Sequence, residues 1–171
     1  MGSGGAITIR RLTLDDVGAY TRLRAAMVEA EPFAFLGAPG DDDCADATIM
    51  RARLASPETE IVAAEADGAL VGSAGVYRDQ RVKTRHRATI WGVYVAPTVR
   101  ARGVGRGLVS AAIEIARGWS GVELVQLSVS ARHAGARRLY ERLGFVAWGE
   151  EPDAIIVNGE RASEVFMQRR L

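Results

Sequence analysis

Apolar and polar residues recur along the chain with the periods of an α/β protein. Alternation over 7–12 predicts a strand, and apolar residues at helical spacing from Val17 to Met27 predict the helix that follows. The acidic run Asp41–Asp43 predicts the start of a second helix, which ends before Pro57. The other predicted elements are strands over 60–66, 69–77 and 88–95, a helix ending at 118, a strand over 124–130, a helix around residue 140, and two closing strands.

Turn residues set the connections between these elements. Asp67-Gly68 and Asn158-Gly159 are typical of tight hairpins, so the strands on either side of each are antiparallel. The two strands joined by the helix that ends at 118 are parallel, because a crossover joins them. The sequence therefore predicts a single α/β (α+β) domain over 6–171, with a central mixed, mainly antiparallel sheet flanked by helices. The element order is β-α-α-β-β-β-α-β-α-β-β, and residues 1–5 are expected to be a flexible N-terminal extension.

Composition narrows the class of protein. The 171 residues suit one domain, and 48% hydrophobic with 25% charged residues is ordinary for a globular chain. A net charge of +1 predicts no general attraction to nucleic acid or to an acidic membrane. No apolar run approaches the length of a membrane span, and the N-terminus shows no signal-peptide core. Cys44 is the only cysteine, which favours a cytoplasmic protein without a disulfide, and we expect no metal site.

A basic, glycine-rich turn follows the strand that ends at Val95. It carries arginines at 100, 102 and 106 between Pro97 and the helix that opens near Gly105. Such a turn presents backbone N–H groups at a helix N-terminus, and this arrangement binds phosphate. Gly105 is not followed by Lys-Ser/Thr, so the turn is no P-loop, and its glycine spacing differs from that of the Rossmann fingerprint.

A second segment, 131–145, follows the strand over 124–130. The Arg100-x-x-Gly103-x-Gly105 turn, followed by Ala136…Leu139-Tyr140-Glu141…Gly144-Phe145, resembles the GCN5-related N-acetyltransferase (GNAT) superfamily. The strand with Trp91 resembles a subgroup that has a Trp-Gly-x-Tyr-Val strand. The resemblance implies an enzyme that transfers an acetyl group from acetyl-CoA, as co-substrate, to a primary amine of a small molecule or peptide.

The resemblance also implies where acetyl-CoA binds. The pantetheine arm would pair with a strand that splays from its parallel neighbour, and the pyrophosphate would lie in the glycine-rich turn. His133 stands where the superfamily usually has an asparagine, so it either contacts the cofactor or caps a helix. Arg100 and Arg106 would contact the phosphates, or they would simply be solvated surface side chains. The implied cofactor-binding residues are Val93, Tyr94, Val95, Arg100, Ala101, Arg102, Gly103, Val104, Gly105, Arg106, His133 and Tyr140.

Catalytic roles follow from the same resemblance. Tyr140 would protonate the departing thiolate. The alternative is that Tyr140 is a buried side chain that only packs in the core. Some superfamily members carry a glutamate base where this chain has Ser128, and a serine alone is no base. The amine would then lose its proton through water held by Ser128 or the backbone, or to an acid elsewhere, such as Glu31 or Glu164. An amine with a low pKa would need little help.

The acceptor is expected between the loop after the first helix and the C-terminal hairpin. Glu31, Phe33 and Trp91 are the candidate substrate residues, since acids and aromatic rings suit a cationic amine, although Trp91 is equally suited to the core. The basic run 78–87 lies at the opposite end of its strand from the glycine-rich turn and is expected to be a solvated turn.

We therefore expect a cytoplasmic N-acetyltransferase whose partners are acetyl-CoA and an amine acceptor. A homodimer formed through strands or helices near the C-terminus is expected, and nucleic acid and membrane partners are not. The alternative function is an acyl-CoA-binding sensor or regulatory module with little or no turnover, which the serine at position 128 keeps open. The sequence leaves the identity of the amine and the length of the acyl chain open.

Overall fold

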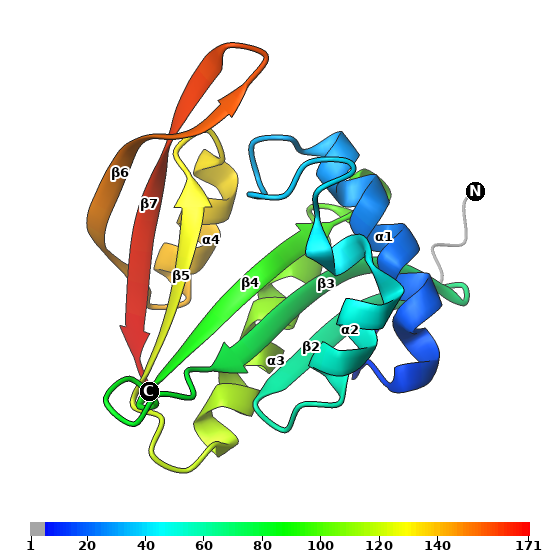
Figure 1. Ribbon diagram of the computed structural model, residues 1–171, viewed down its shortest axis with the longest axis horizontal. Coiled ribbons are helices and arrows are strands. Elements are labelled where there is room, and N and C mark those ends of the chain that lie inside the picture. Colours follow the sequence, from blue (N-terminus) through cyan, green and yellow to red (C-terminus); the bar gives the residue numbers. More distant parts are fainter. Residues whose placement is uncertain (1–5) are drawn as a thin grey trace.

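A computed structural model describes residues 6–171, so the predicted extension over 1–5 lies outside the described residues. Seven strands form one sheet with the order β1-β2-β3-β4-β5-β7-β6 (Figure 1). The strands are β1 (Thr8–Arg11), β2 (Thr59–Ala66), β3 (Ala69–Arg78), β4 (Arg87–Val95), β5 (Leu124–Ser130), β6 (Val146–Val157) and β7 (Glu160–Arg170). The helices are α1 (Val17–Ala30), α2 (Ala47–Leu54), α3 (Val104–Gly118) and α4 (Ala134–Arg142).

Local hydrogen bonds explain where the first helices begin. A capping box between Thr13 and Asp16 opens the turn that leads into α1. Asp46 caps α2, accepting hydrogen bonds from the backbone N–H groups of Thr48 at 2.7 Å and Ile49 at 3.0 Å. The helix therefore begins after the predicted Asp41–Asp43, because Asp46 supplies the cap.

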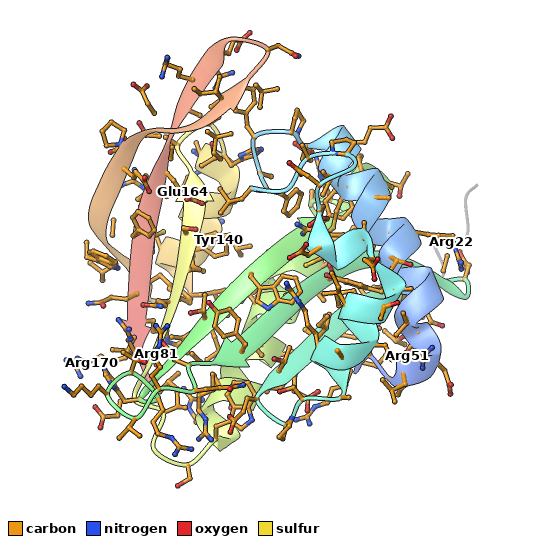
Figure 2. All side chains as sticks on the ribbon, viewed as in Figure 1. Arg22, Arg51, Arg81, Tyr140, Glu164 and Arg170 are labelled. Atoms are coloured by element: carbon orange, nitrogen blue, oxygen red, sulfur yellow. The ribbon has the colours of Figure 1, made fainter. Side chains whose placement is uncertain are left out.

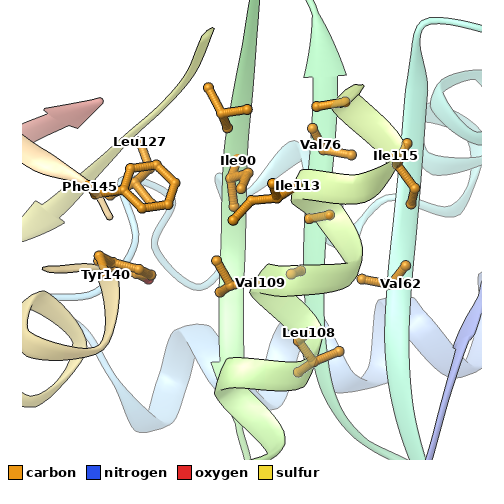
Figure 3. Close-up of a cluster of buried hydrophobic side chains, with 14 of the residues drawn as sticks. Val62, Val76, Ile90, Leu108, Val109, Ile113, Ile115, Leu127, Tyr140 and Phe145 are labelled. Carbon is orange, nitrogen blue, oxygen red and sulfur yellow. The ribbon is translucent and has the colours of Figure 1, made fainter. Parts of the chain in front are cut away.

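Helices cover both faces of the sheet and bury its apolar side chains. On one face α3 packs its apolar side against β2, β3 and β4, with Leu108, Val109 and Ile113 fully or almost fully buried (Figure 3). On the other face α1 and α2 enclose a second cluster that includes Tyr20 and Met50. No helix within residues 6–171 is long and apolar enough to cross a membrane.

The sheet opens in its middle, between β4 and β5. These two strands are parallel and pair only over Arg87–Thr89 and Leu124–Gln126. Beyond that point they diverge, and Figure 1 shows the opening between the ends of β4 and β5. The parallel crossover and the mixed sheet were both predicted from the sequence, and both are confirmed.

Candidate active site

A β-bulge in β4 lies at the opening. Trp91 pairs with Gly75 and Tyr94 pairs with Ser73, so β4 carries one more residue than β3 between these pairs. Gly92 in the bulge has a φ of +59°, and its carbonyl accepts a hydrogen bond from Ser73 Oγ at 3.1 Å. Bulges bend a strand and interrupt its pairing, so this one helps to turn β4 away from β5.

A cleft of about 890 Å³ runs between the diverging strands. We call it the cofactor-side cleft, and its walls are the end of β4 with the glycine-rich turn and, opposite, β5 with α4. Of the cofactor residues predicted from the sequence, Arg102 is absent from its lining. The others all line it, namely Val93, Tyr94, Val95, Arg100, Ala101, Gly103, Val104, Gly105, Arg106, His133 and Tyr140.

The glycine-rich turn has the geometry of an anion site. Gly103 has a φ of +79° and stands at the N-terminus of α3, a conformation that favours glycine. A Cβ on Gly105 would lie 3.3 Å from Leu139 Cδ2, so this glycine brings the turn close to α4. The lining includes four arginines, at 100, 106, 132 and 142, against the single acid Glu31. This excess of positive charge beside a helix N-terminus suits a ligand with several phosphates.

Glu31, at the end of α1, contacts both walls of the cofactor-side cleft. Arg100 Nη2 donates to Glu31 Oε1 at 2.6 Å, and His133 Nε2 lies 3.5 Å from Glu31 Oε2. Burial raises the pKa of Glu31, but the bonds from Arg100 and His133 outweigh it and hold the pKa below its usual range. An ionised Glu31 thus links α1 to the glycine-rich turn and to α4. Its place is the cofactor side, although the sequence suggested an acceptor role.

Tyr140 projects from α4 into the cofactor-side cleft. Its side chain is 5% exposed, and its ring meets Phe145 edge-on with 6.0 Å between centroids (Figure 3). Burial raises the pKa of Tyr140 well above its usual value. The phenol therefore stays protonated at neutral pH, as a proton donor must.

A second cleft, of about 1100 Å³, lies on the side of the sheet that carries α1 and α2. We call it the acceptor-side cleft. It shares six lining residues with the cofactor-side cleft, namely Ala34, Phe35, Ile90, Trp91, Gly92 and Ser128. The two clefts therefore meet where β4 leaves β5, with the bulge on one side and Ser128 on the other.

The acceptor-side cleft contains Arg24, a side chain that sequence reasoning did not single out. Arg24 of α1 is buried, bonds Asp42 through Nη2 at 3.1 Å and stacks on the Phe35 ring at 4.6 Å. Arg78 and Arg81 from the basic run also line this cleft, at the end of β4 remote from the glycine-rich turn, as predicted (Figure 2). No local sequence pattern indicates that these groups meet, because the chain reversals of the fold bring them together.

The other predicted acceptor residues differ in position. Trp91 lines both clefts, and its ring lies against Gly75, where a Cβ would approach Trp91 Cε2 to 2.3 Å. Phe33 lines neither cleft, and the Arg132 guanidinium covers its ring at 3.9 Å from the centroid.

Ser128 Oγ donates to Glu164 Oε1 at 2.7 Å, so the serine at the expected base position has a carboxylate partner from β7.

Comparison with known proteins agrees with this geometry. Residues 22–145 match the model of the acetyltransferase (GNAT) family. The chain belongs to this family. It is similar to the N-alpha-acetyltransferase RimI of Mycobacterium tuberculosis, with 36% identity over 75% of this chain and 77% of that one. It is also similar to a phosphinothricin N-acetyltransferase of Alcaligenes faecalis, with 31% identity over 97% of this chain and 83% of that one.

The fold is shared with solved structures. The crystal structure of a ribosomal-protein-alanine N-acetyltransferase from Brucella melitensis superposes with a TM-score of 0.82, at 25% identity over 96% of this chain and 99% of that one. The predicted family, fold and enzyme class are therefore confirmed. The chain is an N-acetyltransferase, and acetyl-CoA is its co-substrate.

Proposed function

We propose that acetyl-CoA enters through the cofactor-side cleft, and that a primary amine of a small molecule or peptide enters through the acceptor-side cleft. The observation that carries this proposal is the junction of the two clefts at Trp91, Gly92 and Ser128, with Tyr140 on the cofactor side. The amine would meet the thioester there, between β4 and β5.

In this proposal the cofactor-side cleft holds the pyrophosphate and the pantetheine arm of acetyl-CoA. In this proposal the backbone N–H groups from Gly103 to Arg106 hold the pyrophosphate, and the guanidinium groups that line the cleft neutralise its charge. The amides of the pantetheine arm pair with the free edge of β4 at Val93–Val95, as an added strand would. Arg102 lies outside the lining, and we assign it no contact.

The chemistry would proceed by direct attack of the amine. The nitrogen lone pair attacks the thioester carbonyl carbon while a backbone N–H of β4 stabilises the developing negative charge on oxygen. The C–S bond breaks, its electrons pass to sulfur, and the Tyr140 phenol donates its proton to the thiolate. A tyrosine phenol is protonated at neutral pH and burial raises the pKa of Tyr140 further, so the proton is present at the start of each turnover.

We propose that the acceptor is a primary amine of a peptide or a small molecule. The names of the two relatives, an N-alpha-acetyltransferase and a phosphinothricin N-acetyltransferase, support a primary amine of a peptide or small molecule. Trp91 and Phe35 would supply apolar walls near the junction. Because Phe33 lies outside both clefts, its contact with an acceptor would require the loop after α1 to move.

The proposal also covers the cellular location, the oligomeric state and the partners of the enzyme. We infer a cytoplasmic homodimer that has no nucleic acid or membrane partner. The outer edge strand β6 supports self-association, since it exposes the apolar side chains Val146, Trp148 and Ile156. A binding module without turnover is not favoured, because the chain belongs to a family of acetyltransferases.

The test is release of free thiol from acetyl-CoA in the presence of amino acids, polyamines, aminoglycosides and peptides. We expect release with one class of amine, and Tyr140→Phe should lower kcat about 100-fold or more while acetyl-CoA still binds. Tyr20→Phe is the control, because it removes a buried tyrosine hydroxyl that has no hydrogen-bond partner within residues 6–171. No thiol release with any amine would contradict the proposed function.

A further inference from the structure

Two carboxylates of the acceptor-side cleft, Glu164 and Asp41, have no basic side-chain partner within residues 6–171. Within residues 6–171, Glu164 has no arginine, lysine or histidine within salt-bridge distance, although it lines the cleft. Its only side-chain hydrogen bond among the described residues comes from Ser128. The other acids of the cleft have partners: Asp42 with Arg24, Asp43 with Arg53, Asp79 with Arg87, and Asp41 with the backbone N–H of Ala38.

Strand pairing places the Glu164 carboxylate beside the junction of the clefts. Glu164 begins the stretch of β7 that pairs with β5, opposite Ser130, and its side chain reaches Ser128 Oγ at 2.7 Å. Ser128 lines both clefts, whereas Glu164 lines the acceptor side alone. Figure 2 shows Glu164 and Tyr140 both on the β5 side of the opening. The carboxylate thus stands on the amine's side of the junction, and the phenol stands on the cofactor side.

The direction of the hydrogen bond decides what Ser128 offers to the amine. An ionised carboxylate only accepts, so the hydroxyl hydrogen of Ser128 points to Glu164. The lone pairs of Ser128 Oγ are then free to accept a hydrogen bond from an N–H group at the junction. A serine held in this way passes a proton on to its carboxylate, although a serine alone is no base.

We propose that Ser128 and Glu164 form the proton relay that deprotonates the acceptor amine, an inference that rests on the proposed function. The ammonium form of the amine gives one proton to Ser128 Oγ while the hydroxyl proton of Ser128 passes to Glu164, and the freed nitrogen lone pair then attacks the carbonyl carbon. Glu164 becomes a neutral acid and then loses the proton to water. Tyr140 protonates the departing sulfur and regains a proton, through water, from the nitrogen that carries a surplus proton after attack, so the products are the N-acetyl amine and the free thiol of CoA.

Glu164 has an acidic neighbour on the paired strand β6. Glu151 of β6 lies directly opposite Glu164 in the β6–β7 register, and like charges at such positions repel. The other charged side chains of the cleft lining are Arg24 and Asp42, which pair with each other, Arg53 and Asp43, which also pair, Arg78 and Asp79, which pair with Glu58 and Arg87 outside the lining, and Asp41 and Arg81. In this proposal the charge of Glu164, which has no basic partner within residues 6–171, attracts an ammonium group and stabilises the cationic nitrogen that forms on attack.

The test compares Glu164→Gln, Ser128→Ala and the double variant with the wild type, using the amine that gives the fastest thiol release. We expect each single variant to lower kcat about 100-fold at pH 7, with the KM for acetyl-CoA unchanged. The double variant should be no slower than the slower single variant, because two members of one relay are not additive. Glu150→Gln is the matched control, since it removes the same charge from the same hairpin at a position that lines neither cleft and lies opposite Val165 rather than Glu164.

A pH profile separates a relay from a structural role. The deficit of Glu164→Gln should shrink as the pH rises past the pKa of the acceptor amine, because the amine then arrives without its proton. A deficit that stays constant with pH, additive losses in the double variant, or full activity in Glu164→Gln would each overturn the relay. Wild-type protein without thiol release would instead contradict the proposed function.

Discussion

At the scale of single residues, the contact between Gly75 and Trp91 shapes the junction of the clefts. A Cβ on Gly75 would lie 2.3 Å from Trp91 Cε2, so Gly75→Ala must displace the indole or the strand. We expect a loss of about 1–3 kcal/mol in the free energy of unfolding, together with a higher KM for the acceptor. Urea unfolding and steady-state kinetics measure both.

Gly149→Ala is the control for this substitution. Gly149 also lies in a strand, β6, but a Cβ there would meet nothing within 4 Å. This variant should unfold within about 0.5 kcal/mol of the wild type. If Gly75→Ala and Gly149→Ala behaved alike, the tight contact with Trp91 would have no energetic importance.

The Arg24–Asp42 pair is a second residue-scale feature, because both side chains are less than 10% exposed. Asp42→Ala would leave the Arg24 charge buried without its partner, and we expect a loss of about 3–5 kcal/mol in the free energy of unfolding. Asp43→Ala is the matched control, since Asp43 is 70% exposed and lies 3.8 Å from Arg53, so its loss should stay below about 1 kcal/mol. Equal losses in the two variants would contradict this account.

At the scale of elements, one carboxylate joins β1 to the start of α1. Asp16 accepts hydrogen bonds from Arg10 of β1 and from the backbone N–H of Thr13, and the bonds from Arg10 hold the pKa of Asp16 far below its usual range. A lowered pKa in the folded state adds stability above the unfolded pKa near 4, and this stability is lost as the pH falls through the folded value.

Asp16→Asn should therefore lower the free energy of unfolding by about 1–2 kcal/mol at pH 7, since it weakens an ion pair and a cap. The difference from the wild type should shrink as the pH falls below about 4 toward the folded pKa, because Asp16 itself then becomes neutral. Unfolding curves at several pH values measure this. A difference that stays the same down to the lowest pH would contradict the assigned pKa shift.

Periodicity and turn chemistry predicted most elements, because they are local. The strand over 124–130 matches β5 at both ends, and Asn158-Gly159 stands at the turn between β6 and β7. The start of α2 was missed because four nearby aspartates all suit a helix cap, and tertiary contacts decide among them. Asp42 bonds Arg24 and caps a short 3-10 helix over Asp43–Ala45, and Asp46 caps α2 after it.

At the scale of the whole molecule, the site is an opening in the sheet where two clefts meet. The glycine-rich turn and the Tyr140 helix were predictable, because their residues are neighbours in sequence and resemble a known family. Two side-chain contacts of the site were not predictable, because they join distant positions: Glu31 and Arg100 are 69 residues apart, and Ser128 and Glu164 are 36 apart. Their pairing depends on the register of β7 on β5 and on where α1 ends.

The exposed apolar side chains of the edge strand β6 allow a test of the proposed homodimer. Trp148 is 59% exposed there and lies against Phe166 of β7, with 5.5 Å between ring centroids. If β6 forms the proposed homodimer interface, Trp148→Lys should shift the mass measured by light scattering from dimer to monomer. Lys83→Glu, in the turn between β3 and β4, is the control for altered charge. A monomeric wild type would contradict the homodimer.

The central claim is that acetyl-CoA places its thioester at the junction of the two clefts. A crystal structure of the enzyme with acetyl-CoA tests this most directly. The account predicts the pyrophosphate at Gly103 to Arg106, the pantetheine arm along Val93–Val95, and the sulfur within about 3.5 Å of the Tyr140 hydroxyl. A thioester that lies away from both Tyr140 and Ser128 would contradict the account.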